Sequence, residues 1–590
     1  MNTPDLQAYF SQFADPAKWQ ALFQFPPQFA FPASAQMAHP QMANPQMANQ
    51  QWAQLLQSSL PADAAVHVDP GRMAQIQEEY LQALTRLWQE VSAGKIPALQ
   101  DKRFSSPAWQ SSPLAAFSAA LYLLNARTLA SMSDAVQGSA KMKQRIRFAI
   151  QQTVDAMSPA NFLVTNPEAQ QKIIETKGES LQRGIAHMLE DLHKGHISQS
   201  DESAFEVGRN VATTEGAVVF ENEVMQLIQY KPATRTVYAR PLVMVPPCIN
   251  KFYILDLQPA NSLVRYAVSQ GHTVFLVSWR NPQQEQGHLS WDDYVEEGAI
   301  RALKVAAEIT GQKEVNAFGF CVGGTIVATA LAVLAARGEK LAASLTLLTS
   351  LLDFADTGVL DVYIDEAQVG RRELEIGRGG LMPGRDFAAA FSSLRPNDLV
   401  WNYVESNYLK GEDPPPFDLL YWNADSTNLP GPMFCWYLRK LYLEDKLKEP
   451  NALTTCGQPV DLGRLDLPAF IYASREDHIV PWTSAYASTR IINRRKPANN
   501  RFILGASGHI AGVINPPEKK KRSYWSSKAL PPDAQDWLAG ASEHPGSWWP
   551  QWAAFLARQG GPEVAAPGRY GNARHKPIEA APGRYVRVKA

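Results

Sequence analysis

Two glycines flank a cysteine where a short apolar strand is expected to meet an apolar helix, and this junction constrains the fold more than any other feature of the chain. Residues 315–318 suit a buried strand, residues 319–323 read Gly-Phe-Cys-Val-Gly, and an Ala/Val-rich helix is expected to follow. Glycines at these positions let a strand turn sharply into a helix without a Cβ clash, so the central side chain is held exposed at the sheet's edge. The pattern predicts a nucleophile elbow centred on Cys321.

The nucleophile in this elbow is a thiol, whereas the commoner elbow carries serine. A thiolate is the better nucleophile near neutral pH, and a thioester keeps an acyl group activated for transfer. The thiol of Cys321 therefore favours an acyl transferase over a hydrolase. The alternative is a small buried cysteine in a tight turn, which is the usual fate of a free thiol. The expected strand-turn-helix context, and the Asp and His that follow it, favour catalysis.

Bulk composition excludes several classes of function. The 590 residues include 56 Lys plus Arg and 57 Asp plus Glu, for a net charge of -1, which gives no reason to propose nucleic acid as the main partner. Four scattered cysteines signal neither a disulfide framework nor a zinc site, so no metal is expected and a reducing cytosol fits best. No secretory signal is visible, and the longest apolar stretches, such as residues 326–336, fall short of the roughly 20 residues of a transmembrane helix.

The chain divides by pattern into three regions. Residues 1–70 are rich in Gln, Ala, Pro and Met, with a five-residue near-repeat at 36–50, and predict a mobile low-complexity segment that acts either as a neutral tether or as a contact for an apolar partner. Residues 71–200 show apolar spacing of three and four residues, which predicts a helical domain. The helical stretches expected there are 72–88, 113–132, 142–154 and 179–192.

Residues 201–590 predict an α/β domain, because short apolar runs alternate with helical stretches such as 294–309 and 325–337. The first two runs suit an antiparallel hairpin and the rest suit buried parallel strands. The runs are 218–220, 224–230, 242–245, 273–279, 315–318, 345–349, 469–473 and 502–504. The long gap predicts an inserted cap at about residues 352–455. The repeat Ala-Ala-Pro-Gly-Arg-Tyr at 565–570 and 580–585 lies in a basic end, which predicts a charged, exposed tail.

A thiol nucleophile needs a base, and the base needs an acid to orient it. Asp477 and His509 each follow a predicted strand, in the chain order expected after an elbow, at the sheet edge where open α/β sheets build their sites. His478 is the rival base, but it follows Asp477 directly, so the two side chains should diverge, and we expect a structural role. Asp256 and Asp353 are the alternative acids.

The oxyanion hole is expected to use the backbone N–H of Val322 and one N–H from the loop at residues 246–250. This loop begins with two prolines, which cannot donate. Either Cys248 or Ile249 is therefore the second donor, and the sequence leaves both open.

Several motifs, in order along the chain, resemble those of class I poly(3-hydroxyalkanoate) synthases, the bacterial polyester polymerases. The resemblance does not extend in detail to the first seventy residues. It implies an α/β-hydrolase fold with an inserted cap or lid, preceded by a mostly helical N-terminal domain. The motifs that carry it are residues 158–162, 245–251, 318–325, 395–401, 474–480 and 505–512.

The resemblance implies polymerisation of (R)-3-hydroxyacyl-coenzyme A, with 3-hydroxybutyryl-coenzyme A favoured, and release of free coenzyme A without an added cofactor. Cys321 would carry the growing chain as a thioester and His509 would deprotonate it. Asp477 would help to activate the attacking 3-hydroxyl, either directly or through His509. The family also implies a homodimer on polymer granules in the cytoplasm. Arg395 is a candidate contact for coenzyme A phosphates, with an ordinary cap salt bridge as the alternative.

Two other functions stay open from sequence. A thioesterase or polyester depolymerase could use the same fold, although its elbow would normally hold serine. A granule-associated protein could retain the fold without activity. Formation of insoluble polymer from the acyl-coenzyme A substrate separates these possibilities.

Overall fold

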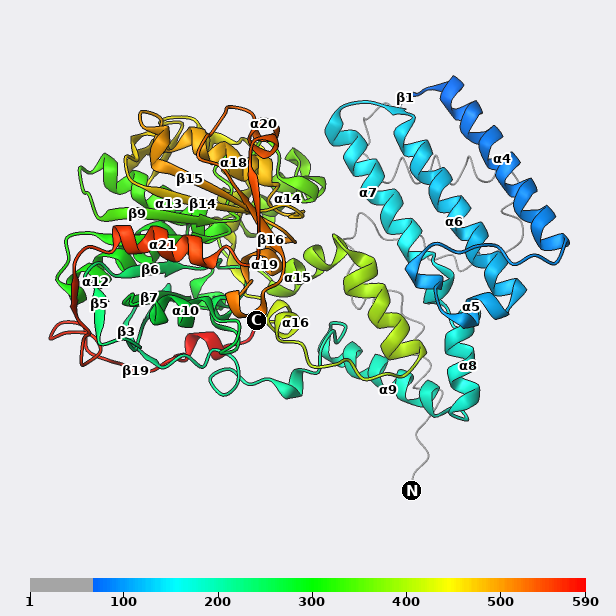
Figure 1. Cartoon of the computed structure of the whole chain (residues 1–590), viewed down its shortest axis with the longest axis horizontal. Coiled ribbons are helices and arrows are strands. Elements are labelled where there is room, and N and C mark those ends of the chain that lie inside the picture. The colour runs from blue at the N-terminus through cyan, green and yellow to red at the C-terminus, as the bar shows by residue number, and fades with distance from the viewer. Residues whose placement is uncertain (1–66) are drawn as a thin grey trace. The chain divides into compact units, whose positions relative to one another are not determined.

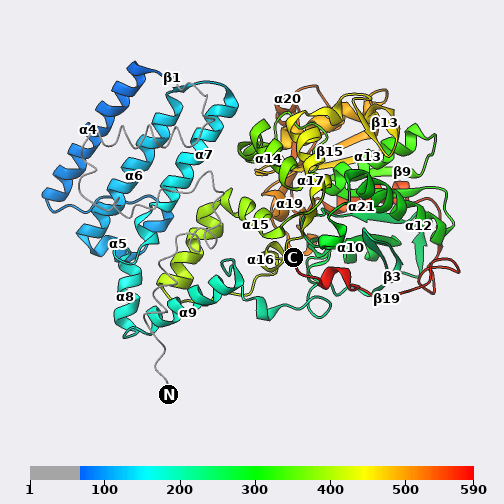
Figure 2. The same ribbon diagram turned by 180° about the vertical axis from the view of Figure 1, so that it is seen from behind.

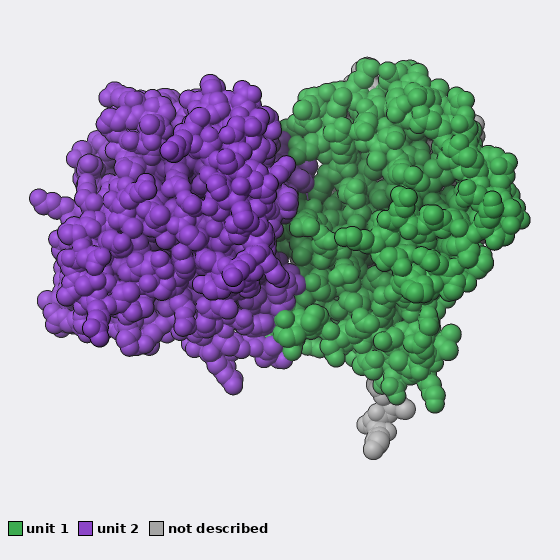
Figure 3. Space-filling view, viewed as in Figure 1, with its two compact units in different colours: residues 1–202, 388–416 green, residues 203–387, 417–590 purple. Residues whose placement is uncertain are grey.

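A computed structural model of the chain describes residues 67–590 and divides them into two compact units (Figures 1 and 3). The first unit holds residues 67–202 and 388–416, and the second holds residues 203–387 and 417–590. The predicted segment 1–70, including its five-residue near-repeat, lies almost entirely outside the described residues. Among the described residues no helix is long and apolar enough to cross a membrane.

The first unit is helical, as the apolar spacing predicts. In Figures 1 and 2, α6 lies between α4 and α7. Each of these three helices begins at a side chain that accepts a hydrogen bond from backbone N–H groups of the first turn, namely Asp69, Ser112 and Ser139. The helices are α4 (Pro70–Ser92), α5 (Pro107–Ser111), α6 (Pro113–Asp134), α7 (Ala140–Ala156), α8 (Pro167–Glu175) and α9 (Glu179–Lys194), and a small β1 (His67–Val68) pairs with β2 (Val136–Gln137).

The segment 388–416 groups with the helical unit, whereas the sequence places it inside the cap at about 352–455. Polar contacts that are buried or partly buried explain the difference. The amide of Asn397 donates to the Asp155 carboxylate over 2.6 Å, and the Gln152 amide donates to the Ser393 carbonyl over 2.6 Å. Lys410 pairs with Glu168 at 2.7 Å. Such partners are distant in sequence, so apolar periodicity does not reveal them.

The second unit is built on an eleven-stranded mixed sheet. The six central strands, in the order β7-β6-β8-β9-β14-β15, are all parallel, and antiparallel strands flank them on both sides. The predicted hairpin is β3–β4, and every predicted strand is present with ends shifted by a few residues. The strands are β3 (Gly216–Glu221), β4 (Met225–Tyr230), β6 (Leu242–Val245), β7 (Val274–Trp279), β8 (Val315–Phe320), β9 (Ala342–Leu348), β14 (Ala469–Ser474), β15 (Asn500–Gly505), β16 (Ser523–Ser526), β17 (Ser542–Pro545) and β19 (Glu579–Ala580).

Helices flank this sheet, which buries side chains on both of its faces and explains the nearly continuous apolar strands. Tyr266 of α10 packs on Trp549 of α21, with ring centroids 5.2 Å apart, and these two helices share one core cluster with the strands. The helices are α10 (Leu263–Ser269), α12 (Arg301–Thr310), α13 (Val322–Ala336), α18 (Trp482–Ile491), α19 (His509–Val513), α20 (Ala534–Ala539) and α21 (Trp549–Gln559), and the π-helical η8 (Tyr294–Ile300) contacts both α12 and α13.

A mostly helical insertion separates β9 from β14 in the second unit, as the gap in the strand pattern predicts. It includes η9 (Gly358–Tyr363), α14 (Glu366–Ile376), α16 (Asp418–Ala424), α17 (Gly431–Trp436) and η12 (Tyr437–Leu443), with the short strand pairs β10 (Leu381–Met382) with β11 (Leu429–Pro430) and β12 (Leu453–Thr455) with β13 (Gln458–Val460). Helix α15 (Gly384–Ser393) crosses the boundary between the two units.

The prediction of an exposed C-terminal tail is wrong for its last part. Strand β18 (Glu563–Ala565) pairs with β5 (Thr236–Tyr238), and β19 extends the main sheet beside β3. Tyr585 and Val586 in η17 (Tyr585–Arg587) are buried. The basic residues favoured the prediction of an exposed tail, but the tyrosine and valine between them pack against the sheet.

Candidate active site

The predicted elbow is present between β8 and α13. Cys321 has φ +52° and ψ −130°, an unusual backbone for a residue with a side chain, and such strain is concentrated at functional sites. A Cβ on Gly319 would lie 2.3 Å from the Cα of Gly324, and a Cβ on Gly323 would lie 2.3 Å from the carbonyl oxygen of Val245. Both positions therefore require glycine, and the turn presents a half-buried Cys321 at the carboxyl end of β8.

His509 and Asp477 meet at the same edge of the sheet. Asp477 follows β14, and His509 begins α19, shortly after β15. The Nδ1 atom of His509 lies 2.6 Å from Oδ2 of Asp477, with 6% of the histidine side chain and none of the aspartate side chain exposed. Oδ1 of Asp477 accepts the backbone N–H groups of Ile479 and Val480, each over 2.9 Å. These bonds fix the carboxylate, and the carboxylate in turn orients the imidazole.

Electrostatics link the imidazole to the nucleophile. Burial by itself lowers the pKa of His509, but the Asp477 carboxylate and the Cys321 sulfur, each through its charge and a side-chain hydrogen bond, raise that pKa from 6.5 to about 10. The imidazole also stacks on Phe320, with ring centroids 5.7 Å apart. The structure thus brings Cys321, His509 and Asp477 together, and the raised pKa of His509 favours its imidazolium form.

The loop expected to complete the oxyanion hole lies against the elbow. Val245 of β6 pairs with Gly319 of β8, and Gly323 approaches the carbonyl oxygens of Val245 and Pro246 so closely that a Cβ there would lie within 2.5 Å of each. Burial, with a smaller contribution from Cys321, raises the pKa of the Cys248 thiol far above its ordinary value. A neutral Cys248 side chain therefore lies close to the nucleophile, next to Ile249.

The alternative acids have structural partners elsewhere. Asp256 accepts hydrogen bonds from the hydroxyls of Thr214 at 2.5 Å and Ser262 at 2.6 Å, and Asp353 pairs with Lys448 at 2.8 Å.

Two further predicted residues lie as follows. The backbone carbonyl of His478 accepts the N–H of Val359, and the half-buried His478 side chain is not the one that pairs with Asp477. Arg395 belongs to the other unit and forms an ion pair with Asp398 at 2.5 Å, so its contact with coenzyme A stays a prediction.

Sequence reasoning missed an aromatic group in the insertion. The rings of Phe354, Tyr437 and Tyr442 pack edge-on, with centroids 5.0 to 6.3 Å apart. Burial raises the pKa of both tyrosines, and the charge of Cys321 raises both further, which indicates that the phenols lie near the nucleophile. The only signal available in the sequence is a tyrosine pair five residues apart, and this pair does not indicate a site until the fold of the insertion is known.

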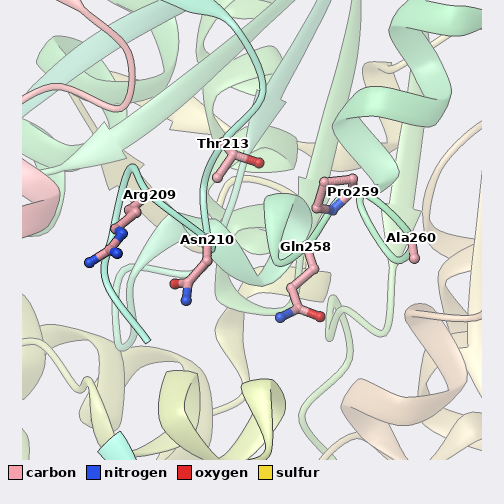
Figure 4. Close-up of a pocket in the computed structure, with 6 residues that line it drawn as sticks. All are labelled: Arg209, Asn210, Thr213, Gln258, Pro259 and Ala260. Carbon is pink, nitrogen blue, oxygen red and sulfur yellow. The ribbon is translucent and has the colours of Figure 1, made fainter. Parts of the chain in front are cut away.

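A separate surface pocket of about 440 Å³ lies in the second unit (Figure 4). It contains none of the predicted site residues, and an exposed arginine side chain lies at its edge. Its lining residues are Arg209, Asn210, Thr213, Gln258, Pro259 and Ala260. Across residues 67–590, no group of three or more His, Cys, Asp or Glu side chains could hold a metal ion.

Comparisons with known proteins identify a fold and a family for this chain. Residues 100–267 match the family model for the poly-beta-hydroxybutyrate polymerase (PhaC) N-terminus, and residues 241–516 match the alpha/beta hydrolase fold. These matches confirm the predicted fold class. Among solved structures, a monoacylglycerol lipase of Paleococcus ferrophilus is 13% identical, with 48% of this chain and 90% of that chain covered and a TM-score of 0.31.

Curated relatives are similar over most of their length. The poly(3-hydroxyalkanoate) polymerase subunit PhaC of Cupriavidus necator is 62% identical over 539 residues, which is 90% of this chain and 91% of that protein. The corresponding subunit of Rhizobium meliloti is 38% identical, with 88% and 87% covered. Poly(3-hydroxyalkanoate) polymerase 1 of Ectopseudomonas oleovorans is also 38% identical, with 83% and 87% covered.

Proposed function

The chain belongs to the poly(3-hydroxyalkanoate) polymerase family, and from this premise we propose that it polymerises (R)-3-hydroxyacyl-coenzyme A, preferably 3-hydroxybutyryl-coenzyme A, through a thioester on Cys321. The observation that carries the proposal is the 2.6 Å contact between His509 and Asp477 beside a cysteine elbow. An acyl-coenzyme A is already an activated thioester, so the proposed reaction needs no added cofactor.

In the first step, the thiolate of Cys321 attacks the thioester carbonyl of the substrate. The proton of the thiol passes to Nε2 of His509, whose imidazolium the buried Asp477 stabilises. The new bond joins Cys321 sulfur to the acyl carbon, and the bond from that carbon to coenzyme A sulfur breaks. His509 returns the proton to the leaving thiolate, so free coenzyme A departs as a thiol.

In the second step, the 3-hydroxyl oxygen of another acyl group attacks the Cys321 thioester. An ester bond forms between this oxygen and the acyl carbon, and the bond from that carbon to the Cys321 sulfur breaks, so Cys321 leaves as a thiolate. We propose that His509 accepts the hydroxyl proton and that Asp477 acts through His509. The hydrogen bonds of Asp477 support this role, because Oδ2 binds His509 and Oδ1 accepts two backbone N–H groups. A substrate hydroxyl that bound Asp477 directly would have to compete with these hydrogen bonds, and the Asp477 side chain has no exposed surface.

We assign the oxyanion hole to the backbone N–H of Val322 and one N–H from the loop that contains Cys248 and Ile249. The close approach of Gly323 to the carbonyl of Pro246 supports a fixed spacing between the two parts of the hole. The aromatic group of Phe354, Tyr437 and Tyr442 supports a dry acyl site, because its rings pack together and both tyrosines are buried within the electrostatic influence of Cys321.

The deciding experiment supplies purified protein with (R)-3-hydroxybutyryl-coenzyme A and measures both free coenzyme A and insoluble polymer. We expect the wild type to give both and Cys321→Ala to give neither. Release of coenzyme A with only free hydroxy acid would instead identify a thioesterase. If the wild type releases no coenzyme A and forms no polymer, the result would favour an inactive granule-associated protein.

We also propose a homodimer that acts at the surface of polyester granules in the cytoplasm. The support is family membership together with a reaction whose product is an insoluble polyester. Sedimentation velocity across protein concentrations tests the dimer, and a single monomeric species at all of them would contradict it. Fractionation of cells that accumulate polyester tests granule attachment.

A further inference from the structure

The last residues of the chain form an ordered segment that crosses the second unit. We define residues 579–590 as the C-terminal strap. Its first two residues form β19, which pairs with β3 at Glu579 with Val218 and Ala580 with Ala217. Further along, the hydroxyl of Tyr585 donates to the carbonyl of Asn222 over 2.9 Å. The strap is therefore fixed to the sheet before it reaches its end.

The end of the strap binds the loop that carries the oxyanion donors. The ammonium of Lys251, in a residue only 2% exposed, donates to the backbone carbonyl of Val588 over 2.6 Å. Burial lowers the pKa of Lys251 to about 8, against the attraction of Asp425. A buried ammonium is costly without a partner, so the Val588 carbonyl fixes the place of Lys251 and with it the end of the loop.

Lys589 makes the second contact of the strap. Its ammonium lies 3.0 Å from Oδ2 of Asp425, whose side chain is 1% exposed, whereas the Lys589 side chain is 61% exposed. The hydroxyl of Tyr253 donates to the same oxygen over 2.9 Å. The other oxygen, Oδ1, has no hydrogen-bond partner among the described residues. Without Lys589, this buried carboxylate would lose its ion pair and keep the Tyr253 hydroxyl as its hydrogen-bond donor, which favours a rearrangement of this segment.

The segment after Asp425 is joined directly to the loop. The N–H of Thr427 donates to the carbonyl of Ile249 over 2.7 Å, and Asn250 forms an isolated β-bridge with Ser426. Lys251 and Asp425 thus anchor the two sides of this joint, and the strap binds both of them. The opposite end of the loop lies against the elbow at Gly323.

We propose that the C-terminal strap is a positioning element of the oxyanion hole, which acts through Val588 on Lys251 and through Lys589 on Asp425. The inference rests on the proposed function, because it assigns the support of the same loop. Oxyanion donors work only at hydrogen-bond distance from the oxygen that becomes charged, so a shift of a fraction of an ångström in the loop is enough to slow acyl transfer.

The test uses the full-length protein with Lys589→Met, which removes the ion pair at an exposed position, and Lys589→Arg, which keeps a cation there. Lys576→Met is the matched control, since it removes an exposed positive charge from the tail outside the strap. A second variant ends the chain at Arg587, so that Lys251 loses the Val588 carbonyl and Asp425 loses Lys589. Two rates are measured: the release of coenzyme A in the first turnover, and the alkylation of Cys321 by iodoacetamide, followed by mass spectrometry.

Alkylation of a thiolate forms no oxyanion, whereas acyl transfer does. We expect Lys589→Met and the shortened chain to slow acylation about tenfold through kcat, with KM and the alkylation rate unchanged, and Lys589→Arg to recover most of the rate. Lys576→Met should match the wild type. Equal losses of acylation and alkylation would overturn the proposal in favour of a general structural role, and unchanged acylation in both strap variants would overturn it outright. A wild type that releases no coenzyme A would instead refute the proposed function.

Discussion

The replacement Asp477→Asn tests the site most directly. Asparagine keeps the size of the side chain and can keep Oδ1 as an acceptor for Ile479 and Val480, but it removes the charge that lies 2.6 Å from His509. If its amide nitrogen faces Nδ1, the imidazole must carry its proton on Nε2 and can no longer accept one from Cys321. The substitution therefore alters chemistry with little change in packing.

The magnitude follows from the pKa of His509. Asp477 and Cys321 hold it at about 10, against the lowering effect of burial. A return to the ordinary 6.5 would remove about 5 kcal/mol of preference for the charged imidazole. We expect the acylation rate to fall by a factor between about 10² and 10⁴.

The assay separates the two roles proposed for Asp477. Single-turnover release of coenzyme A reports the first acylation, and polymer mass reports elongation. If Asp477 acts through His509, Asp477→Asn should slow both steps, and alkylation of Cys321 should rise more steeply with pH than in the wild type. Acylation within threefold of wild type, with elongation alone lost, would refute this reasoning and assign Asp477 directly to the hydroxyl.

Three more outcomes are expected. Phe320→Leu removes the ring that stacks on His509 and should lower kcat about threefold to tenfold at constant KM, measured by coenzyme A release. Gly323→Ala places a Cβ 2.3 Å from the carbonyl oxygen of Val245 and should lower both the melting temperature and the activity. Gly370→Ala, in open space within α14, should instead raise the free energy of unfolding in urea by about 0.5–1 kcal/mol. His272 is buried, and burial lowers its pKa to about 4, so as the pH falls the unfolded chain takes up a proton on this histidine before the folded protein does. The contribution of His272 to the free energy of unfolding is therefore full above pH 6.5 and falls toward pH 4 by up to about 3 kcal/mol. His272→Phe should abolish this loss in unfolding measured across that range. An acid sensitivity equal to wild type in His272→Phe would contradict this account.

Local chemistry made much of the catalytic unit predictable from sequence. The elbow could be recognised because Gly319 and Gly323 lie at positions where a Cβ would collide with the backbone, a requirement set within a few residues. Asp477 and His509 could be placed because parallel strands end at one edge of a sheet, so residues 32 apart in sequence become neighbours. Short apolar runs likewise marked the strands, because both faces of this sheet are buried.

The remaining features depend on partners that lie far away in the chain. Residues 388–416 join the helical unit through contacts such as Asn397 with Asp155, 242 residues apart. The strap was predicted to be exposed because Arg584, Arg587 and Lys589 make it basic. Its position nevertheless depends on Lys251, 337 residues before Val588. A local sequence pattern reports the polarity of one segment, but it does not identify the distant residues against which that segment packs.

The path of the proton favours one base for the whole cycle. When coenzyme A leaves with the proton that His509 held, the imidazole is neutral and its Nε2 can accept the proton of the next 3-hydroxyl. Transfer of the acyl group to that oxygen frees Cys321 as a thiolate beside the imidazolium form of His509, which the raised pKa of His509 favours. Each hydroxyl proton thus ends on a coenzyme A thiol, and no second base is required. Throughout the cycle, the buried oxygens of Asp477 keep the fixed contacts that Ile479, Val480 and His509 provide, so the imidazole stays in place for each proton transfer.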